Sequence, residues 1–63
     1  MERQVRVKIE WIDAYGRGVG KLPDGTIVIA ENAEPGREYV VSVVREVRVG
    51  DVRAIYGVAV AAL

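Results

Sequence analysis

The sequence predicts an all-β protein, a small barrel of five short antiparallel strands. Valine and isoleucine dominate its apolar residues, with thirteen valines and five isoleucines against two leucines. β-branched side chains fit the pleated surface of a sheet, and a chain poor in leucine makes a poor helix bundle. Residues typical of tight turns interrupt the apolar segments at short intervals, and no segment has a helical period. With 63 residues, 51% of them hydrophobic, the chain suits one ordered domain, which we place at residues 1–63.

In the first predicted strand, apolar and polar residues alternate with a period of two, and the face expected in the core carries Val5, Val7, Ile9 and Trp11. Two turns, at residues 23–26 and 34–37, place a glycine where a tight turn needs a positive φ. Gly50 and Asp51 fit a two-residue hairpin of type II′. The expected strands are residues 5–11, 19–22, 27–30, 39–49 and 52–60, followed by a short tail at 61–63.

The long fourth strand mixes its two faces, because Arg45 falls on the apolar parity and Val40 and Val44 fall on the polar parity. Such mixing indicates a β-bulge, or a strand shared between two parts of a curved sheet. Gly57 indicates a kink or bulge in the fifth strand. A flat five-stranded sheet would leave two edges bare, whereas closure removes them. We therefore expect a small five-stranded OB-like or SH3-like antiparallel β-barrel.

Three glycines, Gly16, Gly18 and Gly20, lie within five residues between the first two strands. A glycine-rich loop that binds phosphate presents its N–H groups at a helix N-terminus, but here a strand follows. We therefore interpret this segment as a tight corner that lets the second strand fold back on the first. We predict a positive φ at Gly16 or Gly18, and a loss of stability when alanine replaces either one.

The composition argues against an enzyme. Cysteine and histidine are absent, and serine and threonine occur once each. Disulfides, thiol nucleophiles, imidazole acid–base chemistry and the common zinc sites are thereby excluded, so we expect no catalytic residue, metal or cofactor. Asp13 with Asp24 or Glu10 would form a carboxylate pair, but nothing in the sequence indicates a pocket that shifts their pKa values. No apolar run reaches the roughly 18 residues of a membrane span and no signal peptide is visible, so we expect a cytoplasmic protein.

Nine basic and nine acidic residues give a formal net charge of zero, but the charges are unevenly distributed. Residues 24–38 carry four acids and one arginine, a net charge of −3, so the remainder carries +3. Seven of the nine bases are arginine, whose planar fork binds phosphate and stacks on bases. The same arginines, with one Asn, one Gln and no Cys, also suit a thermophile. Both interpretations of the arginines, RNA binding and thermal stability, stay open at this point.

Basic residues on polar strand positions and beside the turns are the candidates for contact with RNA phosphates. They are Arg6, Lys8, Arg17, Lys21, Arg45, Arg48 and Arg53. Tyr15, in the glycine corner, is the candidate ring for base stacking. The other rings share the apolar parity of their strands and are expected in the core; they are Trp11, Tyr39 and Tyr56. The alternative is that the basic residues pair across strands with Glu10, Glu46 and Asp51, at about 0–1 kcal/mol a pair.

Three motifs follow one another along the chain: the corner Tyr15-Gly16-Arg17-Gly18-Val19-Gly20-Lys21, the strand Ile27-Val28-Ile29, and the turn Ala33-Glu34-Pro35-Gly36-Arg37 before the long valine strand. Their order resembles that of TRAM domains, small barrels appended to tRNA uracil methyltransferases and methylthiotransferases that also occur alone as short archaeal proteins. The resemblance covers about residues 5–60. It implies a five-stranded OB-like barrel that binds tRNA-like or single-stranded RNA.

A second function class fits other features of the sequence. The neutral charge, the absence of phenylalanine and the apolar end at residues 58–63 suit a protein-interaction or assembly module without nucleic-acid binding. A barrel of this size gains stability by association, because it cannot enlarge its own core. An engineered scaffold is a third reading. We expect a monomer or weak homo-oligomer, with no membrane contact and no small-molecule substrate.

Overall fold

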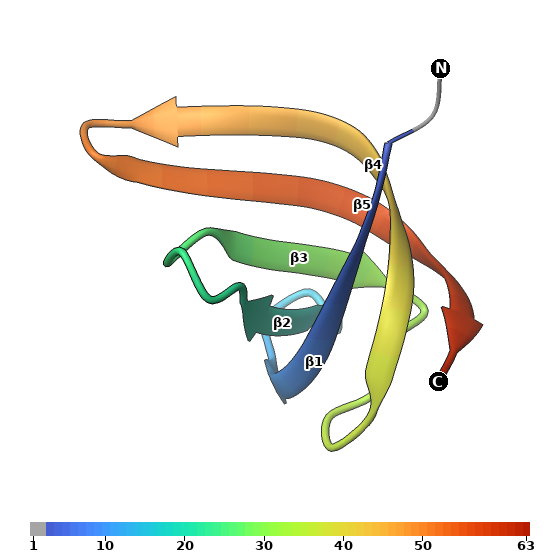
Figure 1. Ribbon diagram of the computed structural model, residues 1–63. Helices are drawn as coiled ribbons and strands as arrows, with labels where there is room; N and C mark the ends of the chain where they lie inside the picture. The colour runs from blue at the N-terminus through green and yellow to red at the C-terminus, as the bar shows by residue number, and fades with distance from the viewer. Residues whose placement is uncertain (1–2) are drawn as a thin grey trace.

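The computed structural model describes residues 3–63 and confirms the all-β prediction (Figure 1). The predicted domain begins at Met1, and residues 1 and 2 lie outside the described part. Within it the chain forms the strands β1 (Gln4–Ile12), β2 (Gly18–Lys21), β3 (Ile27–Glu31), β4 (Glu38–Val49) and β5 (Val52–Ala62). Residues 3–63 contain no helix that is long and apolar enough to span a membrane.

The five strands close into a barrel in the order β1-β2-β3-β5-β4, and β4 pairs with β1 to complete the ring. Four neighbouring pairs are antiparallel and β3 and β5 run parallel, which is consistent with the small OB-like barrel that we expected. The reason for the parallel pair is geometric: a closed ring with an odd number of strands cannot alternate direction throughout, so at least one pair is parallel. In this ring β5 lies between β3 and β4 (Figure 1).

The core lies inside this ring, and the residues that β1 and β4 bury include Val7, Ile9 and Val41, which lie on the faces that the sequence indicated. Its largest fully buried side chains are Ile9, Val28, Val41 and Ile55, one each from β1, β3, β4 and β5. Tyr39 is buried as predicted, and its hydroxyl accepts a hydrogen bond of 3.0 Å from the Glu34 backbone N–H. One ring is thus packed in the core with its polar end satisfied.

The strand register shifts at three places: one lies between Val40 and Val41 of β4, and the other two decide which side chains leave the core. The β4–β5 register shifts between Val43 and Arg45, which confirms the predicted irregularity in the fourth strand and leaves Val44 as the extra residue. The β1–β2 register shifts between Ile9 and Trp11. The core prediction for Trp11 is therefore wrong: the side chain is 49% exposed, because the extra residue in β1 breaks the alternation that would have turned it inward.

The core prediction for Tyr56 is also wrong. Its chain neighbours Ile55 and Gly57 are buried, so the alternation of β5 turns the Tyr56 side chain to the outside of the barrel, where it is half-buried. The end of β5 differs from prediction as well. Instead of a tail after residue 60, the strand continues to Ala62, because Ala61 and Ala62 pair with the start of β4.

The glycine corner has the predicted geometry. Gly16 has a φ of 81°, and the corner folds β2 back against β1 in an antiparallel pair. Gly20 serves a second purpose, because a Cβ at this position would collide with the Lys8 carbonyl oxygen of the neighbouring strand. The corner therefore needs one glycine for its dihedral angle and another for close approach of two backbones.

Candidate nucleic-acid interface

A row of outward-facing side chains crosses all five strands, and Val19 is its one buried member. The register pairs Trp11 with Val19, Val19 with Ile29, Ile29 with Tyr56, and Tyr56 with Arg45. Cross-strand partners lie on the same face of a sheet, so these residues follow one another around the outside of the barrel. The row joins two aromatic rings and an arginine that are far apart in the sequence.

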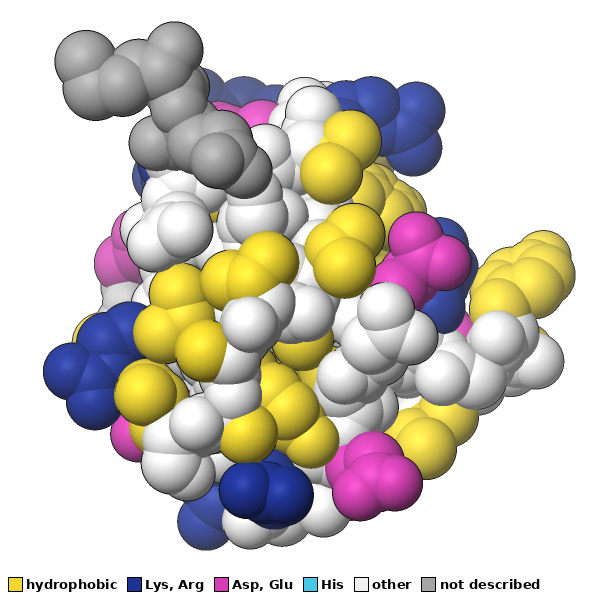
Figure 2. All heavy atoms as spheres, turned by 90° about the vertical axis from the view of Figure 1, so that its right-hand side faces the viewer, with side chains coloured by type: hydrophobic (Ala, Val, Ile, Leu, Met, Phe, Trp, Pro, Cys, Tyr) yellow, Lys and Arg dark blue, Asp and Glu magenta, His cyan; other side chains and the backbone are white. Residues whose placement is uncertain are grey.

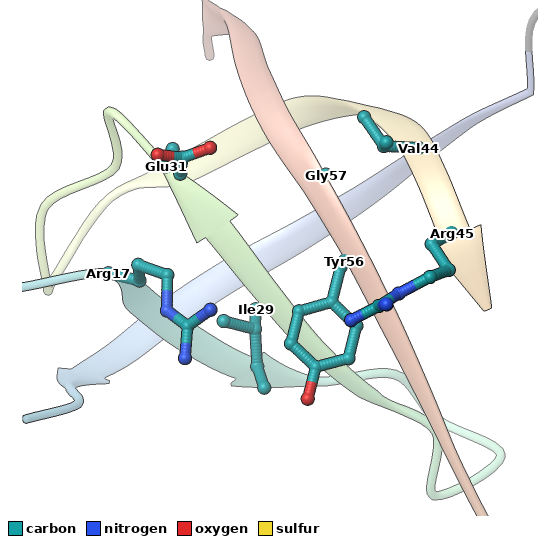
Figure 3. A pocket seen from close by; sticks show the side chains of 7 residues that line it. All are labelled: Arg17, Ile29, Glu31, Val44, Arg45, Tyr56 and Gly57. Atoms are coloured by element: carbon teal, nitrogen blue, oxygen red, sulfur yellow. The ribbon is translucent and has the colours of Figure 1, made fainter. Parts of the chain in front are cut away.

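A cleft of about 300 Å³ lies over the β3, β5 and β4 part of this row (Figure 3). That volume is at the lower end of the range for small-ligand sites. Apolar side chains form much of its wall, and charged groups stand at its sides. The lining residues are Arg17, Ile29, Glu31, Val44, Arg45, Tyr56 and Gly57.

Tyr56 is the aromatic centre of the cleft. The guanidinium carbon of Arg45 lies 5.0 Å from the centroid of its ring, and that of Arg17 lies 5.6 Å from it. Figure 3 shows both arginine side chains reaching toward the ring, one from β4 and one from the loop that precedes β2. A guanidinium within about 6 Å of an aromatic face is attracted by the ring quadrupole. The two cations therefore restrain the ring and surround it with positive charge.

The loop between β1 and β2 holds Arg17 in place through Asp13. One Asp13 carboxylate oxygen accepts 2.9 Å hydrogen bonds from the backbone N–H groups of Tyr15 and Arg17, and the other accepts a 2.8 Å bond from Arg17 Nε. Burial raises the pKa of the Asp13 carboxyl, but these hydrogen bonds outweigh burial and lower the pKa below its usual value. Asp13 thus stays ionised and orients Arg17 toward the cleft.

Tyr15 projects from the same loop and is 83% exposed, as predicted. Its ring lies 5.0 Å from the guanidinium carbon of Arg17. Arg17 is therefore shared between two rings, one largely exposed to solvent and one in the cleft. The predicted residues Tyr15, Arg17 and Arg45 come together at this site.

Arg53 lies elsewhere, in a chain of ion pairs. Its Nε donates a 3.1 Å hydrogen bond to Glu46, which also accepts a 2.7 Å bond from Arg3, and Asp24 lies 3.8 Å from a second Arg53 nitrogen. The hydrogen bond to Glu46 raises the pKa of Arg53, and the bonds from Arg53 and Arg3 lower the pKa of Glu46. The pairing alternative that the sequence left open is thus realised at this residue.

The other four predicted basic residues lie on exposed strand positions outside the cleft. Arg6 and Lys8 lie on β1, where Arg6 is 3.6 Å from a carboxylate oxygen of Glu38. Lys21 ends β2, and Arg48 lies near the tip of the β4–β5 hairpin. These four cations are thus divided among β1, β2 and the β4–β5 hairpin.

Sequence reasoning missed three residues of the site, Trp11, Tyr56 and Glu31. The outward direction of the Tyr56 side chain could have been predicted from Gly57. A glycine suits the crowded inside of a barrel, so its neighbour in the strand points outward. The bulge that exposes Trp11 has no local sequence marker. Glu31 was assigned only to the acidic stretch, and its place beside Tyr56 depends on the parallel pairing of β3 with β5.

Residues 3–63 contain no cluster of carboxylates suited to a metal ion. In comparisons with known proteins, the chain matches no family model, no curated protein and no solved structure. The chemistry of the side chains around the cleft is therefore the main guide to its function.

Proposed function

We propose that this barrel is a non-enzymatic RNA-binding protein that takes single-stranded or tRNA-like RNA across the outer face of β3 and β5. One observation carries the proposal: the ring of Tyr56 lines a cleft with two guanidinium groups within 5.6 Å of its centroid. An aromatic ring flanked by arginines stacks an unpaired base and neutralises the adjacent phosphates.

The location of the cleft supports the proposal. Barrels of the OB type bind oligonucleotides on the face of strands 2 and 3, between the loop that joins strands 1 and 2 and the loop that joins strands 4 and 5. Here the cleft covers β3, the loop with Tyr15 and Arg17 borders it, and the β4–β5 hairpin supplies Arg45. The resemblance of the sequence to TRAM domains is an independent support.

The zero net charge is compatible with this function because only the local charges act on a bound strand. Arg45 has its charge available at the cleft, since among residues 3–63 it forms no ion pair, whereas Arg17 shares its charge with Asp13 at 2.8 Å. Few free cations imply a modest affinity with a shallow dependence on salt, about one unit of slope per phosphate contact. Stacking therefore supplies a large part of the binding free energy.

The experiment is a titration of fluorescein-labelled single-stranded RNA and of tRNA by fluorescence anisotropy, at about 50 and about 200 mM salt. Binding that weakens with salt is the expected result. Trp11, the only tryptophan, is exposed in the same outer row, so its emission should change in step with the anisotropy. Absence of binding at the lower salt concentration, or binding indifferent to salt, contradicts the proposal.

An assembly module is the second candidate, and the exposed apolar residues favour it. Val60 and Leu63, at the end of β5, are 55% and 54% exposed. In Figure 2, hydrophobic side chains gather in the middle of the face where β4 begins and β5 ends. Light scattering over a concentration series tests this function, because an assembly module shows a mass that rises with concentration and a monomer does not.

A further inference from the structure

We infer that the cleft selects guanine, because Glu31 is placed to accept hydrogen bonds from the edge of a base stacked on Tyr56. This inference rests on the proposed RNA binding and adds a base preference to it. Glu31 differs from Asp13 and Glu46, the carboxylates that pair with arginine side chains.

The Glu31 carboxylate has no partner within residues 3–63, although it lines the same cleft as Arg17 and Arg45. Asp13 and Glu46, by contrast, are each bound by an arginine side chain at 2.8 Å and 2.7 Å. Arg17 turns to Asp13, and Arg45 lies over the Tyr56 ring. Glu31 therefore presents two unoccupied acceptor oxygens to whatever enters the cleft.

The register places this carboxylate beside the ring. Ile29 pairs with Tyr56 and Glu31 pairs with Val58, so Glu31 lies two residues further along the same outer face of β3. Two residues of a strand span about 7 Å. A base that stacks on Tyr56 thus has Glu31 at its edge and not beneath its plane, as the positions of the two side chains in Figure 3 suggest.

An ionised carboxylate only accepts hydrogen bonds, and it offers two oxygens side by side. On the Watson–Crick edge of guanine, the N1–H and N2–H groups are adjacent donors that match these oxygens. Adenine, cytosine and uracil each combine one donor group with acceptors on that edge, so their lone pairs would face the negative charge. Recognition of splayed bases through this edge is the usual basis of specificity for single-stranded RNA.

The experiment compares short oligouridines that contain one central guanosine, inosine or adenosine, since inosine differs from guanosine only by the missing N2 amino group. The native protein should bind the guanosine oligomer about fivefold or more tightly than the other two, because a bidentate contact is worth about 1–3 kcal/mol. Glu31→Gln should remove this preference. Glu34→Gln is the matched control: it changes the same charge on an exposed glutamate of the 34–37 turn, outside the cleft, and should keep the preference.

Thermal melting of both variants checks that each is folded. Equal binding of the three oligomers by the native protein, or a guanine preference that persists in Glu31→Gln, overturns the inference and leaves RNA binding standing. If none of the oligomers, an all-uridine oligomer included, binds at low salt, the proposed function fails together with the inference.

Discussion

Arg45 and Tyr56 are direct cross-strand partners on the outside of the barrel, with the arginine's guanidinium carbon 5.0 Å from the centroid of the tyrosine ring. The pair exists because the bulge at Val44 shifts the register of β4, which otherwise keeps its odd-numbered residues in the core. The same shift leaves Val44 exposed at the border of the cleft. One extra residue in β4 thus builds one side of the candidate binding site.

The Tyr56 ring is expected to provide most of the stacking free energy. Tyr56→Ala should weaken the binding of single-stranded RNA by roughly 5- to 150-fold, because stacking on an aromatic ring is worth about 1–3 kcal/mol per base. Tyr56→Phe is the control, since it keeps the ring and removes only the hydroxyl. Fluorescence anisotropy measures both, and an alanine variant that binds like the native protein would exclude this ring from the interface.

Arg45 should contribute a phosphate contact that salt can screen. Arg45→Gln should weaken RNA binding and reduce the slope of log K against log salt by about one unit. Arg37→Gln removes the same charge from the exposed 34–37 turn and should leave the slope unchanged. Equal slopes for the two variants would mean that Arg45 makes no specific contact and acts only through the total charge of the protein.

Alanine substitution should cost different amounts of folding stability at two glycines of the corner. Gly16→Ala has open space for its Cβ and should cost about 1–2 kcal/mol for the positive φ alone. Gly20→Ala should cost more, because its Cβ would collide with the Lys8 carbonyl and force β1 and β2 apart. A domain of this size has only about 3–5 kcal/mol of stability. Urea unfolding measures the order of the two variants, and the reverse order would contradict the close-approach argument.

The Glu46 ion pairs should make stability depend on acid pH. Hydrogen bonds from Arg53 and Arg3 lower the pKa of Glu46 in the folded protein, so its contribution is present above the ordinary glutamate pKa of about 4.5 and is lost as pH falls through the lowered value. Glu46→Gln should therefore be less stable than the native protein at pH 7, and this difference should shrink in strong acid. Melting temperatures over that pH range test it, with Glu34→Gln as the control that shows no such convergence.

Much of the fold is predictable from the sequence because its determinants are local. Valines and isoleucines at a period of two define the strands, and the predicted ranges agree with the structure to within a few residues. The Gly50 turn also has the predicted dihedral, since Gly50 has a φ of 60° and Asp51 does not have a positive φ. Strands and turns of this kind depend on each residue's backbone preferences and on its immediate neighbours in the chain, and both can be taken directly from the sequence.

The set of residues that make up the candidate site, unlike the strands and turns, could be predicted only in part. Tyr15, Arg17 and Arg45 could be nominated from residue type, but Arg53 belongs to an ion-pair chain and Tyr56 to the outer surface. A bulge shifts every later side chain of a strand by one position, so its placement decides which face Trp11 and Arg45 occupy. The parallel pairing of β3 with β5 then joins residues about 27 positions apart in the chain. The sequence by itself determined the strands and the turns, whereas only closure of the barrel decided which charges and rings meet, because that depends on register between strands and not on the order of residues within one.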